Sequence, residues 1–160
     1  MQKYIAKNLE ETQKIAADFA RGLSPKKSGK IGATVVGLYG ELGSGKTSFT
    51  QGVARAFGIL ETVVSPTFVI EKIYELPLSK NKNEIIPSPC DNNFSHLIHI
   101  DAYRLEKSSE LLHLGWPETI ADPKNLILIE WPERVADIMP PHIRINFRHI
   151  EKEQREIEIL

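Results

Sequence analysis

The sequence contains a single cysteine and no long apolar run. Cys90 has no partner for an internal disulfide, which is typical of a protein that works in a reducing compartment such as the cytoplasm. No stretch approaches the roughly 20 apolar residues that a membrane-spanning helix requires. The start of the chain, MQKYIAKNLE, also lacks the apolar core of an export signal. We therefore expect a cytoplasmic protein without a membrane segment.

An excess of charge of either sign is also lacking. Lys and Arg total 20 and Asp and Glu total 21, so the formal net charge is −1. Strong independent binding to a nucleic acid depends on clustered basic residues that neutralise phosphates, and this balance does not favour it. The length of 160 residues, 41% of them hydrophobic, is typical of one domain spanning 1–160.

The segment GELGSGKTSF (40–49) fits the pattern G-x-x-x-x-G-K-[ST] of a phosphate-binding loop. Glycines allow the backbone to point successive N–H groups at phosphate oxygens, and the following helix adds its partial positive charge. Lys46 would neutralise the β- and γ-phosphates, and the Thr47 hydroxyl would bind Mg²⁺. The apolar run before the loop predicts a buried strand, which is the context that the mechanism requires.

Apolar periodicity predicts helices alternating with buried strands, and a long polar stretch, 77–95, reads as a surface loop within a hairpin. The expected fold is an α/β three-layer sandwich of the P-loop NTPase type, with a mixed, largely parallel central sheet and antiparallel hairpin additions. The expected helices are 8–23, 47–58 and 108–116, and the expected strands are 33–39, 67–76, 95–105, 125–130, 142–150 and 155–160.

Two acids follow predicted strands, where functional residues of α/β sheets gather. Asp101 follows HLIHI, and Glu130 follows the apolar run NLILI. Either acid could hold Mg²⁺ or orient a nucleophile, although each alone could also be an ordinary capping carboxylate. Thr67, in the connection after the loop helix, could add a Mg²⁺ ligand or simply belong to a turn.

ATP is the expected nucleotide. The guanine marker N-K-x-D is replaced by NKNE (81–84), and Asp101 lacks the following glycine of D-x-x-G. Zinc is not expected, because the spacing of Cys90, Asp91, His96 and His99 matches no standard site.

Four segments together resemble the TsaE family, the small ATPase of bacterial tRNA threonylcarbamoyladenosine modification. They are GELGSGKTSF, SPTF (65–68), HIDAYRL (99–105) and ILIEWPER (127–134). The glycine loop alone is generic, whereas D-A-Y-R and E-W-P together are specific to the family. The resemblance implies an accessory ATPase that docks on the TsaD–TsaB heterodimer, which modifies adenosine 37 of tRNA, so contact with tRNA is indirect. The loop 77–95 is longer than the family's usual hairpin.

The resemblance also assigns roles to residues. It implies that Lys46, Asp101 and Glu130 are catalytic, that Thr47, Asp101 and Glu130 bind the metal, and that 65–67 is a switch-like segment. The residues that it implies at the nucleotide are Glu11, Thr12, Glu41, Leu42, Gly43, Ser44, Gly45, Lys46, Thr47, Ser48, Thr67 and Trp131.

Two other functions remain open from the residues. A small-molecule P-loop kinase would need an acceptor pocket and usually an arginine-bearing lid, and no Arg-rich segment suggests one. A nucleotide-regulated binding module would hold Mg²⁺ and ATP without hydrolysis.

Overall fold

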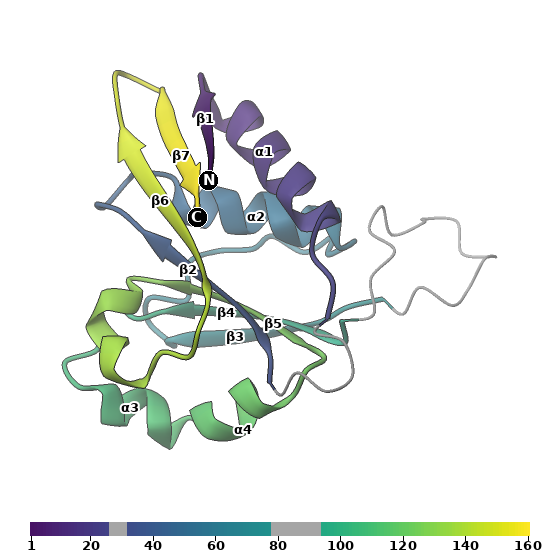
Figure 1. Ribbon diagram of the computed structural model, residues 1–160, viewed down its shortest axis with the longest axis vertical. Helices are drawn as coiled ribbons and strands as arrows, with labels where there is room; N and C mark the ends of the chain where they lie inside the picture. Colours follow the sequence, from purple (N-terminus) through teal and green to yellow (C-terminus); the bar gives the residue numbers. More distant parts are fainter. Residues whose placement is uncertain (26–31, 78–93) are drawn as a thin grey trace.

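The computed structural model describes residues 1–25, 32–77 and 94–160 (Figure 1). Seven strands in these ranges form one sheet in the order β1-β7-β6-β2-β5-β4-β3. The strands are β1 (Gln2–Ala6), β2 (Thr34–Tyr39), β3 (Glu71–Glu75), β4 (His96–Asp101), β5 (Asn125–Glu130), β6 (Ile143–His149) and β7 (Arg155–Ile159). The helices are α1 (Leu9–Arg21), α2 (Lys46–Ala56), α3 (Ser108–His113), α4 (Trp116–Ala121) and the 3-10 helix η1 (Pro132–Ile138).

The sheet is mixed, as the sequence predicts. Its four central strands, β6, β2, β5 and β4, pair in parallel. Antiparallel strands extend it on both sides: β3 pairs with β4, and β7 pairs with β6 and then with β1. The hairpin predicted at the end of the chain is confirmed by the β6–β7 pairing. Most of the predicted loop 77–95 falls in 78–93, outside the described residues.

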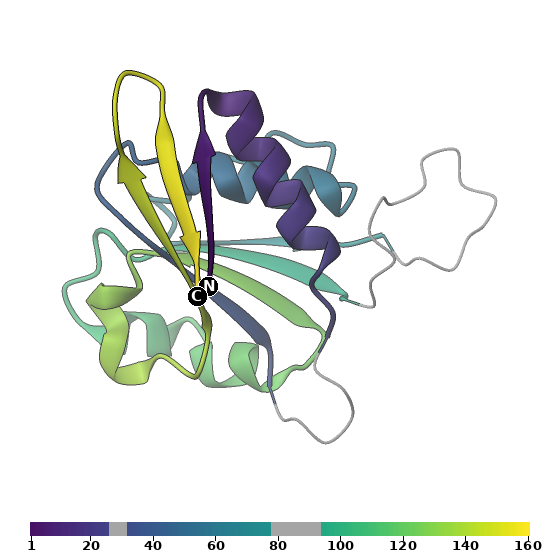
Figure 2. The same cartoon turned by 45° about the horizontal axis from the view of Figure 1, so that its top comes forward.

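Helices cover both faces of the central strands, which confirms the three-layer arrangement. Figures 1 and 2 show α1 and α2 side by side on one face, and α3, α4 and η1 on the other. Each face has its own apolar core. Strand β5 contributes to both: Leu126 and Leu128 pack toward α1 and α2, whereas Ile127 and Ile129 pack toward the other layer. All six residues of β5 are buried, as a continuous apolar run predicts.

The parallel register brings the predicted acids together. Asp101 at the end of β4 is directly opposite Glu130 at the end of β5, and Glu130 is opposite Leu38 near the end of β2. The chain then leaves β2 into the glycine loop. Because parallel strands end at the same sheet edge, residues more than 80 positions apart in the sequence, such as Thr47 and Glu130, meet there.

Three short elements are absent from the sequence expectations: β1, α4 and η1. Strand β1 pairs with β7 at the sheet edge, and both chain ends lie beside each other there (Figures 1 and 2). Among the helices in the described parts of the chain, none is sufficiently long and apolar to cross a membrane.

The contact between α1 and α2 depends on Gly52. A Cβ atom at this position would lie 2.6 Å from the Gln13 carbonyl oxygen and 2.7 Å from the Ala16 Cβ. These neighbours are backbone or short side chain and cannot move away without shifting α1. We expect Gly52→Ala to lower the free energy of unfolding by about 1–3 kcal/mol, despite the higher helix propensity of alanine.

The measurement is denaturant unfolding of Gly52→Ala beside Gly22→Ala. A Cβ at Gly22 would meet its nearest neighbour, the Phe19 carbonyl oxygen, at an ordinary 3.4 Å. The control should therefore stay within about 0.5 kcal/mol of wild type. Equal stability of the two variants would show that α1 and α2 do not need this close approach.

Candidate functional site

The glycine loop joins β2 to α2, and two of its glycines are required by the backbone. Gly40 has φ 146°, and a Cβ there would lie 2.5 Å from the Phe147 carbonyl oxygen. Gly45, the N-cap of α2, has φ 105°, in the left-handed region that other residues rarely adopt. Gly45 has no side chain to cap the helix. The first-turn N–H groups of α2, which as in any helix have no intrahelical acceptor, therefore also lack a side-chain cap, and such uncapped N–H groups can bind anions.

The Lys46 ammonium is held inside this loop. Its Nζ donates hydrogen bonds to the carbonyl oxygens of Gly40, at 2.6 Å, and Glu41, at 2.9 Å. It also lies 4.1 Å from the centre of the Trp131 ring, a cation–π contact. Burial lowers the pKa of Lys46, and the nearby carboxylates, Glu130 first among them, act in the opposite direction. The hydrogen-bond acceptors of the ammonium are thus two neutral carbonyl oxygens, and phosphate oxygens could take their place.

Trp131 reaches this position through an unusual backbone conformation. It has φ 57° and ψ 46°, and Pro132 follows it directly. The proline disfavours the right-handed helical region for Trp131. The Tyr103 ring, 5.1 Å away between centres, packs against the indole. The two rings form an aromatic wall beside Lys46.

Glu130 is buried and accepts two hydrogen bonds on one oxygen. The Thr47 hydroxyl donates to Glu130 Oε1 at 2.8 Å, and His99 Nε2 lies 2.9 Å from the same oxygen. Because the Thr47 hydrogen is donated to the carboxylate, the hydroxyl lone pairs remain available to a cation. The sequence motifs predict the Thr47 and Glu130 positions; the contact of His99 with Glu130 is not among the predictions.

Asp101 belongs to a separate hydrogen-bond network. The hydroxyls of Ser65 and Thr67 both donate to Asp101 Oδ2, Thr67 at 2.7 Å, and the Tyr103 N–H donates to Oδ1 at 3.0 Å. The segment 65–67 is therefore fastened to the end of β4. The Thr67 hydroxyl thus contacts Asp101 directly. This contact is compatible with both expected roles of Thr67, metal ligand and turn residue.

One hollow of about 320 Å³ brings most of the predicted residues together. The residues that line it are Leu42, Gly43, Ser44, Gly45, Lys46, Thr47, Ser48, Ser65, Thr67, Asp101, Tyr103, Glu130 and Trp131. Glu41 is not among them, but its carbonyl oxygen accepts a hydrogen bond from Lys46.

A second hollow of about 230 Å³ adjoins the first. Both are lined by Gly43, Gly45 and Ser48. The remaining residues of the second hollow are Asn8, Leu9, Thr12, Glu153 and Arg155. Thr12, which the resemblance implies at the nucleotide, therefore lies in the wall of a hollow beside the glycine loop.

Glu11 is not among the residues that line the second hollow. Its carboxylate accepts a hydrogen bond from the Lys7 N–H at 2.8 Å, and its own N–H donates to the Asn8 side chain at 2.9 Å. The bond to Asn8 caps the first turn of α1, and the bond to Lys7 joins the Glu11 carboxylate to the residue before this cap. The structure therefore accounts for Glu11 as part of the helix start.

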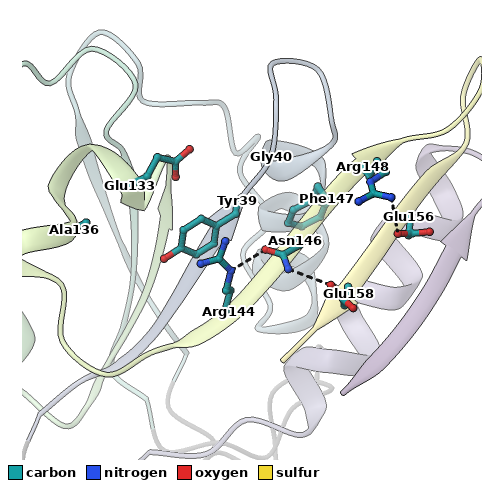
Figure 3. A pocket seen from close by; sticks show the side chains of 10 residues that line it. All are labelled: Tyr39, Gly40, Glu133, Ala136, Arg144, Asn146, Phe147, Arg148, Glu156 and Glu158. Atoms are coloured by element: carbon teal, nitrogen blue, oxygen red, sulfur yellow. Dashed lines mark hydrogen bonds and ion pairs between the residues drawn. The ribbon is translucent and has the colours of Figure 1, made fainter.

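A third hollow, of about 630 Å³, lies on the other side of β2, along β6 and β7. Figure 3 shows Arg144 and Glu158 both joined to Asn146, and Arg148 joined to Glu156. Arg144 Nε donates to Asn146 Oδ1 at 2.9 Å, and Asn146 Nδ2 donates to Glu158 Oε2 at 3.1 Å. Arg144 also stacks on Tyr39 at 3.7 Å from the ring centre. This hollow touches the glycine loop at Gly40 but contains none of the predicted catalytic groups.

The oxygen donors of the first hollow suit Mg²⁺. The hydroxyl of Thr47 and the carboxylates of Glu130 and Asp101 are hard ligands, and Mg²⁺ beside phosphates needs one or two carboxylates from a protein. Within residues 1–25, 32–77 and 94–160, no group of three or more His, Cys, Asp or Glu could hold a metal by itself. Of the four residues weighed for zinc, Cys90 and Asp91 lie outside these ranges, His96 contacts Asn125, and His99 contacts Glu130.

Comparison with known proteins decides the family. The family described as "Threonylcarbamoyl adenosine biosynthesis protein TsaE" matches residues 6–157. The chain belongs to the TsaE family. It is 32% identical over 156 residues to the tRNA threonylcarbamoyladenosine biosynthesis protein TsaE of Bacillus subtilis, covering 97% of this chain and 82% of that protein. It is also 32% identical over 127 residues to TsaE of Treponema pallidum, covering 79% and 81%.

A solved structure supports the fold. The crystal structure of Bacillus subtilis YdiB superimposes with a TM-score of 0.68 at 27% sequence identity, covering 99% of this chain and 83% of that chain. The family resemblance of the four sequence segments and the predicted fold class are both confirmed. The glycine loop, Asp101 and Glu130 therefore belong to a protein with the sequence and the fold of the TsaE family.

The Asp101 network predicts a local effect on dynamics. Removing the carboxylate in Asp101→Ala leaves the hydroxyls of Ser65 and Thr67 without their acceptor. We expect amide hydrogen exchange to become faster in 65–70 while the central strands keep their protection. Hydrogen exchange with mass spectrometry tests this. Asp137→Ala, which removes an acceptor of Ser108 on the other face, is the control; equal exchange of 65–70 in both variants would contradict the prediction.

Proposed function

We propose that this member of the TsaE family is a Mg²⁺-dependent ATPase and an accessory subunit in tRNA threonylcarbamoyladenosine biosynthesis. It would hydrolyse ATP in the cytoplasm, in complex with the TsaD–TsaB pair, and would contact tRNA indirectly. The observation that carries the ATPase proposal is the single hollow that contains the glycine loop, Lys46, the Thr47–Glu130 hydrogen bond and Asp101. Family membership supports the pathway.

The phosphate groups would bind where the loop and α2 present N–H groups. Lys46 would exchange its contacts with the Gly40 and Glu41 carbonyls for β- and γ-phosphate oxygens. The Trp131 ring beside the ammonium supports this geometry without adding a competing charge. The second hollow, continuous with the loop at Gly43 and Gly45, is the place we propose for the adenosine, with Thr12 in its wall.

The two acids would have different roles, because their hydrogen-bond networks differ. Thr47 and Glu130 would hold Mg²⁺, which when bound neutralises charge that develops on the phosphate oxygens. Asp101, joined to the segment 65–67, would orient the attacking water. A change in the position of this segment would then change the position of Asp101, which offers a physical route for a partner protein to influence turnover.

Substitution of Lys46 and of Glu130 tests the division of roles. Lys46→Ala removes a counter-charge to the ground-state phosphates, so nucleotide affinity should fall about tenfold or more, and turnover should be abolished. Glu130→Ala should lose turnover by about 100-fold while nucleotide affinity in the absence of Mg²⁺ changes by less than about threefold.

The measurements are calorimetric titration with ATP and steady-state hydrolysis, with thermal unfolding to confirm that each variant folds. Glu118→Ala, on α4 at the opposite layer, is the matched acidic control and should behave as wild type. Wild-type hydrolysis in Lys46→Ala or Glu130→Ala would overturn the ATPase proposal. Equal losses of nucleotide affinity in the two variants would overturn the proposed division of roles.

Partner dependence is tested by hydrolysis of Mg²⁺-ATP by the purified chain, alone and with the TsaD–TsaB pair. We expect slow turnover alone and an increase of about tenfold or more with the pair, because docking would fix the segment 65–67. The Lys46→Ala variant mixed with the same pair controls for contaminating ATPases. Unchanged turnover with the pair would remove the accessory role, and tight ATP binding without any turnover would favour a nucleotide-regulated binding module.

A further inference from the structure

His99 is a fully buried histidine that the proposed mechanism leaves without a role. Its side chain is 0% exposed and lies on β4, two residues before Asp101. Strand β4 places it opposite Leu128, within the layer between the sheet and α2. A histidine here displaces apolar volume from the core, at a cost in desolvation that packing alone does not offset.

The proton on the imidazole is assigned by its neighbours. Nε2 is 2.9 Å from Glu130 Oε1, and a carboxylate can only accept, so Nε2 carries the hydrogen. Nδ1 has no hydrogen-bond partner among the described residues. In the neutral ring Nδ1 is then a bare lone pair. The only polar interaction found for this side chain in the described part of the chain is the hydrogen bond to Glu130.

This hydrogen bond restricts a carboxylate that would otherwise rotate. The terminal torsion of glutamate is broad, so burial alone does not fix the plane of the carboxylate. Thr47 approaches Oε1 from α2, and His99 approaches the same oxygen from β4. In the described part of the chain, Oε2 accepts no hydrogen bond, and Glu130 lines the hollow of the glycine loop. Two donors on Oε1 thus leave Oε2 as the free acceptor.

We propose that His99 is a positioning residue for Glu130. Its Nε2–H holds Oε1 so that Oε2 is oriented for Mg²⁺ or a metal-bound water. This inference rests on the proposed ATPase function but concerns a separate step: which group orients the acid. Donors behind a metal-ligating carboxylate typically alter metal affinity or activity by about 10–100-fold when removed.

The length of the side chain at position 99 provides the test. In His99→Gln the amide N–H extends about as far as Nε2 and can still donate to Glu130. In His99→Asn the amide is one methylene shorter and ends near the position of Nδ1, out of reach of Oε1. Both variants place a polar amide in the same buried position, so their cost to folding is similar and only the donor to Glu130 differs.

The first readout does not depend on turnover. Each variant, saturated with a non-hydrolysable ATP analogue, is titrated with Mg²⁺, and ATP binding without Mg²⁺ is measured separately. We expect His99→Asn to weaken the apparent Mg²⁺ affinity by about 10–100-fold and His99→Gln by less than about threefold. ATP binding in the absence of Mg²⁺ should be unchanged in both, because His99 does not line the hollow.

The second readout is steady-state hydrolysis. His99→Asn should lower kcat by about 10–100-fold with KM nearly constant, and His99→Gln should restore most of kcat. In a Glu130→Gln background the difference between the two His99 variants should disappear, because the acid through which His99 acts has been altered. His96→Asn, which removes a histidine from the same strand at its contact with Asn125, should match wild type.

Thermal unfolding is measured for all variants, and His99→Leu, without any donor, replaces His99→Asn if the latter does not fold. Equal effects of His99→Asn and His99→Gln, or of His99→Asn with and without Glu130→Gln, would show a packing role and overturn the inference. If wild type binds and hydrolyses Mg²⁺-ATP while His99→Asn matches it, the inference alone fails. If wild type binds no nucleotide, the proposed function fails and the inference fails with it.

Discussion

The parallel pairing of β2, β5 and β4 is the constraint on which the rest of the structure depends. These strands are buried on both faces, so each face must be covered by helices. The same pairing aligns the strand ends, which places Asp101 opposite Glu130 and brings the glycine loop beside them. A shift of one residue between β4 and β5 would turn Asp101 or Glu130 into the opposite layer, so the register that builds the core also builds the site.

Burial of charge explains why the site is so densely hydrogen-bonded. Lys46, Asp101 and Glu130 are each less than about one-twentieth exposed, and a buried charge without partners would be very costly. Each therefore has donors or acceptors fixed by the backbone or by short side chains. Lys46 uses two carbonyls, Asp101 uses Ser65 and Thr67, and Glu130 uses Thr47 and His99. The side-chain networks of the two acids share no residue, although their strands pair directly at Asp101 and Glu130.

The sequence predicts the parts of this site that have a local signature. The spacing of Gly40, Gly45, Lys46 and Thr47 marks the loop, and an acid after a continuous apolar run marks Glu130. The hollow beside α1 lacks such a signature, because Thr12 and Arg155 come from opposite ends of the chain and meet only through β1 and β7. The hydrogen bond from His99 to Glu130 could not be predicted either, because a histidine inside an apolar strand has the same sequence pattern whether it only packs or also donates a hydrogen bond. Strand β1 is short and mostly exposed, so its residues lack the alternation that marks a half-buried strand.

The hollow that we propose for the nucleotide is smaller than the hollow along β6 and β7. The hollow along β6 and β7 is about twice as large as the hollow of the glycine loop. Its arginines, however, already face Asn146 and Glu156, and Arg144 lies flat on Tyr39. A ligand would have to break these contacts before it gained any of its own. In the smaller hollow the helix N–H groups and Glu130 Oε2 lack such partners in the described part of the chain, so a polyanion and its metal ion could add bonds at little cost. The smaller hollow therefore differs from the larger one by its unpaired hydrogen-bonding groups, and not by its volume.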